Sequence, residues 1–139
     1  MKAMGLDIGS VTVGVALSDS LKMIASSYMV IRYEQEDDKL FQQIIDIIEK
    51  EEVDELVVGM PYHMNGDFSE GCQRTRRFEE NIKKRKDIKI IEIDERMSTI
   101  TAQNALLTFD VSRKKRKQVV DKVAASVILQ SYLDRKSIG

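Results

Sequence analysis

Apolar and polar residues alternate with two different periods along this chain, and the change of period separates predicted strands from predicted helices. The first third of the sequence holds three short runs with strand character. The first run reaches Asp7, a tight turn follows at Gly9, and the third run covers Ser27–Tyr33. In the second run, apolar side chains stand at every second position, namely Val11, Val13, Val15 and Leu17. Three successive short strands predict an antiparallel meander.

The middle of the sequence alternates helical and strand patterns. A helical period with one apolar face covers Gln35–Glu51, and a strongly charged helical segment covers Glu70–Lys86. Between them, the nearly all-apolar run Asp54–Gly59 predicts a central strand that is covered on both faces. The run Ile88–Ile93 predicts one more strand. Strands separated by helices in this way indicate a parallel section of sheet.

The last third is predicted to be helical with one interruption. Ser98 resembles the N-cap of a helix over Thr99–Leu107, a basic connector follows at Phe109–Lys117, and a last helix covers Gln118–Asp134. The expected element order is β-β-β-α-β-α-β-α-α. We therefore expect a single α/β domain over residues 1–139, with a five-stranded mixed sheet flanked by helices on both faces.

Composition narrows the possible partners and compartments. The net charge is −1, which excludes a generally basic nucleic-acid coat, so any contact with a polyanion must come from local basic segments such as Lys83–Lys86 and Arg113–Lys117. Cys72 is the only cysteine, which allows no internal disulfide and no cysteine-based zinc site. No apolar run approaches the length of a membrane span or of a leader segment, so we expect a cytoplasmic protein without membrane contact.

Three acidic positions stand out once they are assigned to the predicted elements. Asp7 interrupts the apolar run of the first strand, where an unpartnered carboxylate is costly. Asp94 and Glu95 close the last strand. Asp121 lies at the edge of the apolar stripe of the last helix and is expected to face inward. We expect these acids to converge on one spot.

Converging carboxylates repel one another, by about 4 kcal/mol for a pair about 4 Å apart at an effective dielectric constant of about 20. Divalent cations would remove this cost, and a ligand set made only of oxygens suits Mg²⁺ or Mn²⁺ rather than Zn²⁺. In an alternative interpretation, the acids form structural salt bridges with Arg96 or with nearby lysines. The residues alone leave both interpretations open.

Four sequence blocks, taken together, match a known family. They are Leu6-Asp-Ile-Gly with Gly14-Val-Ala-Leu-Ser-Asp19, then Val57-Val-Gly-Met-Pro61 with Gly66, then Asp94-Glu-Arg-Met-Ser-Thr99, and finally Val120-Asp-Lys-Val-Ala-Ala125 with Ile128-Leu-Gln. The blocks span nearly the whole chain, in order. The chain thus resembles the YqgF (RuvX) family of ribonuclease H-like proteins, described as Holliday-junction resolvases and as nucleases that mature the precursor of small-subunit ribosomal RNA.

The resemblance implies a ribonuclease H-like fold and a metal-dependent nuclease that uses two Mg²⁺ or Mn²⁺ ions. Carried over to this sequence, the catalytic acids that hold the metals would be Asp7, Glu95 and Asp121. Asp94 is a weaker candidate than Glu95, because neighbours on an extended strand point in opposite directions. Arg96 would steady Glu95 or contact a substrate phosphate.

The chain departs from the family pattern at two places. Where the family has a basic residue soon after the Asp-x-Gly motif, this chain has Val11 and Thr12, which weakens any expectation of a phosphate contact there. The loop after the central strand carries His63 and Asn65 where an Asn and an Asp are common. His63 is either a proton shuttle near the metals or a solvated surface residue.

The basic segment before the last helix is the candidate for nucleic-acid binding. Its members precede the helix that carries Asp121 and either contact a phosphate backbone or form a solvated linker; they are Arg113, Lys114, Lys115, Arg116 and Lys117. The family resemblance implies an endonuclease acting on precursor 16S ribosomal RNA, with possible ribosomal-particle partners. A junction-resolving nuclease acting on branched DNA would use the same residues. A binding protein with purely structural acids is the third hypothesis, and the sequence leaves open whether the chain is a monomer or a homodimer.

Overall fold

A five-stranded mixed sheet forms the centre of the computed structural model, which describes residues 1–61, 69–94 and 113–138, with the side chains of the last helix described over 123–135. The strand order is β3-β2-β1-β4-β5. The pairs β1–β2 and β2–β3 are antiparallel, whereas β1–β4 and β4–β5 are parallel. The strands are β1 (Lys2–Ile8), β2 (Thr12–Ser18), β3 (Ala25–Arg32), β4 (Val53–Met60) and β5 (Lys89–Asp94). The predicted α/β class, the meander and the parallel section are confirmed.

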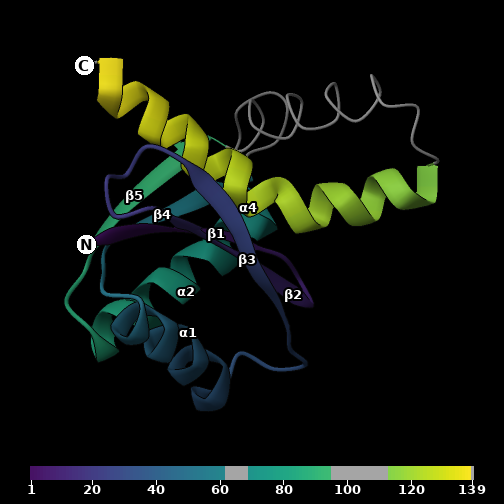
Figure 1. Cartoon of the computed structure of the whole chain (residues 1–139). Coiled ribbons are helices and arrows are strands. Elements are labelled where there is room, and N and C mark those ends of the chain that lie inside the picture. The colour runs from purple at the N-terminus through teal and green to yellow at the C-terminus, as the bar shows by residue number, and fades with distance from the viewer. Residues whose placement is uncertain (62–68, 95–112, 139) are drawn as a thin grey trace.

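Two helices cover one face of this sheet (Figure 1). Helix α1 (Asp38–Lys50) begins where the side chain of Asp37 accepts a hydrogen bond from the amide of Leu40 at 3.0 Å. Helix α2 (Glu70–Arg85) begins at Ser69, whose hydroxyl accepts the amide of Cys72 at 3.1 Å. Their apolar sides bury one core cluster against the sheet, with members that include Leu40, Phe41, Ile44, Ile48, Leu56, Val58, Phe78 and Ile82.

A single long helix, α4 (Arg113–Ile138), crosses the opposite face of the sheet (Figure 1). A second core cluster lies between α4 and the sheet, formed by Ala3, Ala16, Val57, Ile93, Ala125, Ile128, Leu129 and Leu133. Strand β4 contributes side chains to both clusters, which confirms the prediction of a central strand covered on both faces. Within the described ranges, no helix is both long enough and apolar enough to cross a membrane.

One boundary prediction is wrong. Residues 113–117 were expected in a connector, with the helix beginning at Gln118, but the backbone is helical from Arg113 onward. Lysine and arginine are good helix formers, so a run of them extends a helix as readily as it forms a solvated linker. The predicted helix over Thr99–Leu107 and its cap at Ser98 lie outside the described residues, as does His63.

Candidate active site

Asp7 lies near the C-terminal end of β1, on the sheet face that α4 covers. Ala3 belongs to the core cluster beneath α4, and side chains alternate along a strand, so Ala3, Gly5 and Asp7 share that face. Asp7 is half-buried and stands opposite Gly14 of β2. Glycine has no side chain, so β2 brings no bulk against the carboxylate at this pair.

The turn that follows Asp7 is fixed by a residue that the sequence interpretation missed. The amide of Gly9 donates to the carbonyl of Thr12 at 2.8 Å, which closes the turn. Tyr33, which directly follows β3, then holds it, because its amide donates to the carbonyl of Val11 at 3.0 Å and its hydroxyl donates to the carbonyl of Gly9. The ring of Tyr33 packs edge-on against Phe78, with centroids 5.7 Å apart. Burial raises the pKa of Tyr33, which keeps its hydroxyl protonated and able to donate.

Helix α4 is in backbone contact with β1 at Gly5. A Cβ atom at this position would lie 2.7 Å from the carbonyl oxygen of Ala125 and 2.8 Å from the Cβ of Leu129, so only glycine fits. Ala125, whose side chain is small, forms this contact. The distance between helix and strand is therefore set by main-chain atoms.

Helix α4 and strand β1 run in opposite directions. Tyr132 reaches Glu55, which is paired with Ala3, whereas Ala125 and Leu129 lie at Gly5. Moving two residues along β1, about 6.6 Å, reaches Asp7. Moving one turn toward the start of α4, about 6 Å, reaches position 121. Residue 121 thus lies one turn before Ala125 on α4, and Asp7 lies two residues after Gly5 on β1; the side chain of Asp121 lies outside the described residues.

The third acidic position follows β5. Strand β5 pairs with β4 in parallel, with Asp94 opposite Met60. The C-terminal ends of β5 and β1 therefore lie at the same end of the sheet. Ile93 is buried on the α4 face, and alternation turns Asp94 to the other face, away from that of Asp7. Glu95 and Arg96 lie outside the described residues.

Of the predicted metal ligands, only Asp7 has a described side chain. Accordingly, the ranges that the structure covers contain no group of three or more residues placed to hold a metal ion. The nucleic-acid-binding candidates Arg113–Lys117 form the first turns of α4 in the backbone, and their side chains lie outside the described residues.

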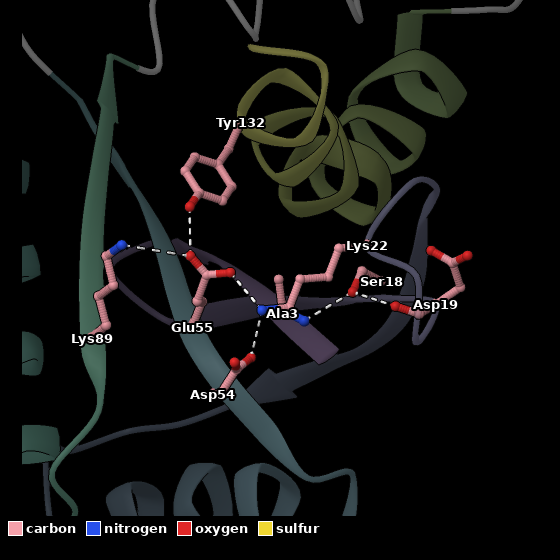
Figure 2. A network of polar contacts seen from close by, with 8 residues as sticks. All are labelled: Ala3, Ser18, Asp19, Lys22, Asp54, Glu55, Lys89 and Tyr132. Carbon is pink, nitrogen blue, oxygen red and sulfur yellow. Dashed lines mark hydrogen bonds and ion pairs between the residues drawn. The ribbon is translucent and has the colours of Figure 1, made fainter. Parts of the chain in front are cut away.

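A second polar cluster, at the opposite end of the same sheet face, was not predicted from the sequence. Glu55 of β4 is only 4% exposed, and its two oxygens have separate partners. Lys22 donates to one oxygen at 2.6 Å, the hydroxyl of Tyr132 donates to the other, and Lys89 lies 3.9 Å from the latter (Figure 2). Lys22 also lies 2.8 Å from Asp54. We call Glu55, Lys22, Asp54 and Tyr132 the Glu55 network.

The protonation states in the Glu55 network favour its present contacts. Burial alone would lower the pKa of Lys22, but hydrogen bonds to Asp54 and Glu55 outweigh it and raise the pKa above its usual value. Burial and the hydrogen bond to Glu55 raise the pKa of Tyr132 to about 12. The lysine is thus charged and the tyrosine neutral at physiological pH, and the buried carboxylate is neutralised by the protein itself.

Comparison with known proteins covers nearly the entire chain. The family model RuvX, described as Holliday junction resolvase, matches residues 1–135. A Bacillus cereus (strain AH187) protein with the provisional name of a pre-16S rRNA nuclease is 42% identical over 137 residues, covering 98% of this chain and 100% of the relative. A relative of the same name from Bacillus thuringiensis (strain Al Hakam) is also 42% identical over 137 residues, with the same coverage.

Several solved structures share this fold at low sequence identity. Thermus thermophilus RuvC in complex with a Holliday junction substrate has a TM-score of 0.59 at 11% identity, covering 98% of this chain and 96% of RuvC. The fowlpox virus Holliday junction resolvase has a TM-score of 0.55 at 11% identity, covering 97% of this chain and 99% of the viral enzyme. These likenesses establish the ribonuclease H-like fold that the sequence resemblance implied. On the family match and the full-length relatives together, the chain belongs to the RuvX family.

Proposed function

We propose that this chain is a metal-dependent endonuclease that hydrolyses phosphodiesters of structured nucleic acid, and that precursor 16S ribosomal RNA is its substrate. The observation that carries the proposal is the setting of Asp7. Its carboxylate lies on the α4 face at the C-terminal end of β1, and α4 touches β1 by its backbone one turn away from position 121. The substrate is supported by full-length relatives named as pre-16S rRNA nucleases.

The donor set fits Mg²⁺ or Mn²⁺. In this proposal Asp7, Glu95 and Asp121 supply only carboxylate oxygens, and the sole cysteine, Cys72, is fully buried on another element. When bound, a pair of such ions would supply a hydroxide nucleophile and stabilise the leaving oxygen of an in-line displacement. The protein's part is to fix the carboxylates: the turn held by Tyr33 limits the movement of Asp7, and the contact at Gly5 fixes the height of α4 above it.

In this proposal the basic residues bind the substrate. Arg96 steadies Glu95 or contacts a phosphate, and the side chains of Arg113–Lys117 contact the backbone next to the scissile bond. Five phosphate contacts would give a slope of about −3.5 for the logarithm of affinity against that of salt concentration on single strands, and about −4.5 on duplex.

A junction-resolving DNA nuclease is the second candidate. The fold shared with RuvC and with the fowlpox virus resolvase favours it, over nearly all of this chain. The same acids would serve either substrate, because both reactions hydrolyse a phosphodiester.

The test is cleavage of labelled precursor 16S ribosomal RNA and of a four-way DNA junction, each with Mg²⁺, Mn²⁺ or EDTA. We expect RNA cleavage that needs the metal and falls at least about 100-fold in Asp7→Asn, since metal ligation is worth several kcal/mol in the transition state. Asp46→Asn is the matched control, because Asp46 is an exposed carboxylate on α1 and the chemical change is the same.

Three outcomes separate the hypotheses. Cutting of the DNA junction alone, lost in Asp7→Asn, moves the assignment to a resolvase. Cleavage that continues in EDTA, or at an equal rate in Asp7→Asn, rejects the metal-dependent site. Equal inertness of wild type and variant on both substrates leaves catalysis by the isolated protein unsupported, and binding of nucleic acid is then measured first; a binding protein with structural acids is supported by an unimpaired Asp7→Asn protein.

A further inference from the structure

The two outer strands of the sheet differ in how they discourage pairing with another chain. Strand β5 carries Lys89 and Glu92, and Glu92 lies 3.8 Å from Arg76 of α2. Charged residues on an edge strand oppose the addition of a further strand. Strand β3, at the other edge, has no charged residue from Ala25 to Ile31. Proteins rarely leave an edge strand in this state unless the edge is used.

Apolar side chains gather along this unprotected edge. They come from the middle of β3 and from the loop before it, and we call them the β3 rim: Tyr28 (39% exposed), Met29 (38%), Val30 (40%), Leu21 (76%), Met23 (63%) and Ile24 (65%). They make up most of the exposed large hydrophobic residues in the described part of the chain. Clustered exposed apolar side chains mark interaction sites.

The loop that presents half of the rim is held in one shape. The carboxylate of Asp19 accepts the amides of Met23 at 2.8 Å and of Ile24 at 3.1 Å. Lys22 has a φ of 56°, an uncommon conformation for a residue with a side chain, and its ammonium is anchored in the Glu55 network (Figure 2). From α4, the amide of Gln130 donates to the carbonyl of Met23 at 3.0 Å. A surface that is already ordered loses little entropy on binding.

The backbone of β3 also presents hydrogen-bonding groups to a partner. Tyr33 donates its amide toward β2, at Val11, and antiparallel strands alternate inward and outward groups. The amides and carbonyls of Val30 and Arg32 therefore point away from the sheet. No further strand pairs with this edge in the ranges that the structure describes. At the other end of β3, Gln130 of α4 accepts the amide of Ala25 at 2.8 Å.

We propose that the β3 rim binds a second copy of this chain, by antiparallel pairing of β3 with β3 of the copy. Such pairing sets the Arg32 end of each strand against the Asp19 end of the other. Arg32 is exposed and forms no ion pair with the described residues, whereas Asp19 presents an exposed carboxylate at the opposite end. Backbone hydrogen bonds from Ile24 and Met23 lower the pKa of Asp19, so its charge is negative at neutral pH. The charges complement each other at both ends, and the strand between them is neutral and apolar.

The pairing would place the two copies of α4 on the same side of one continuous sheet, because residues that face each other across antiparallel strands point to the same face. The two Asp7 residues would then be five strand spacings apart, about 24 Å measured across the strands. This consequence for chemistry rests on the proposed function, whereas the pairing itself does not. A dimer of this kind presents two candidate sites to one branched or folded nucleic acid.

The first experiment is sedimentation equilibrium of the full chain at up to about 100 µM. We expect a dimer for the wild type and a dissociation constant raised at least about 100-fold in Val30→Lys, because the variant places a charged side chain on each strand within the apolar interface. Gln43→Lys is the matched control, since it adds the same charge on an exposed position of α1 and leaves the rim intact. A wild type that stays monomeric over the whole concentration range overturns the proposal. An extended segment of another protein would then be the next occupant to test at the β3 rim.

Crosslinking tests the interface without relying on a disruptive variant. Val30→Cys should join two copies with a short bis-maleimide, whereas Gln43→Cys and the wild type should not, because the native Cys72 is fully buried. Crosslinking of Val30→Cys no faster than that of Gln43→Cys rejects pairing at β3. Neither measurement depends on nuclease activity, so failure of the interface and failure of the proposed function are told apart.

Discussion

Two carboxylates lie on the same face of the sheet beneath α4, one at each end of it. Glu55, at the start of β4, receives the ammonium of Lys22 and the hydroxyl of Tyr132. For Asp7, at the end of β1, the sequence predicts further acids nearby. Position 121 lies one turn before Ala125, which touches β1, and Glu95 directly follows β5 in the sequence.

We expect this comparison to separate structural from catalytic acids. A buried carboxylate that the protein neutralises by itself contributes to folding and has no need of an added ion. Carboxylates that converge repel one another, and a divalent metal ion removes this cost. We infer that the end of the sheet with Asp7 is the reactive end and that the Glu55 network fixes the other end of α4.

The largest expected effect comes from the acid on α4. In Asp121→Asn, single-turnover cleavage in Mg²⁺ should fall at least about 100-fold, because the loss of one ligand removes several kcal/mol of transition-state stabilisation. The double variant with Asp7→Asn should be no slower than the slower single variant, since residues of one site act as a unit. Thermal unfolding in EDTA should be unchanged or shifted upward in each variant, because like charges are removed. Full activity of Asp121→Asn would exclude this residue from the site.

Removing the cation beside Glu55 should give the opposite result. Lys22→Met leaves a buried carboxylate short of its main partner, and we expect a loss of about 3 kcal/mol in the free energy of unfolding, measured with denaturant. Cleavage per folded molecule should stay at the wild-type level. The control is Lys89→Met: this lysine is 68% exposed and 3.9 Å from Glu55, so its loss should cost less than about 0.5 kcal/mol. Equal stability of the two variants would contradict the assignment of Lys22 as the main partner of Glu55.

A smaller effect is expected for the hydroxyl of Tyr132. Tyr132→Phe removes one hydrogen bond to Glu55 and should cost about 1 kcal/mol at neutral pH. The pKa of Tyr132 rises from 10.0 to about 12 on folding, so the stabilisation is complete below pH 10 and is lost as the pH rises through 12. The free energy of unfolding should therefore fall more steeply between pH 10 and pH 12 in the wild type than in Tyr132→Phe. Parallel curves would show that this hydroxyl does not titrate against Glu55.

The sheet was predictable because its signal is local. Alternation through β2 and the continuous apolar run in β4 each lie within a few residues and need no knowledge of the rest of the chain. The Glu55 network could not be found in this way, because Lys22 is 33 residues and Tyr132 is 77 residues from Glu55 in sequence. The same limit applies to Tyr33, whose hydroxyl holds a turn 24 residues earlier.

The candidate site was reached from sequence mainly through its motifs. Asp7 was identifiable because a carboxylate within an apolar strand is unusual. The start of α4 was misplaced, because a run of basic residues satisfies the helical and the solvated interpretations equally well until the backbone is known. Asp121 is tested by the variant described above, whereas the roles of Glu95 and of the basic side chains remain predictions.

The contact at Gly5 has a consequence for how this protein tolerates change. Side chains usually act as spacers between a helix and a sheet, and replacing them alters the spacing. A Cβ atom added at Gly5 would lie 2.7 Å from the main-chain oxygen of Ala125, so no side chain separates the helix from the strand here. The surrounding core can therefore drift through substitution over many generations while the separation between β1 and α4 keeps its value, provided that this one glycine is retained.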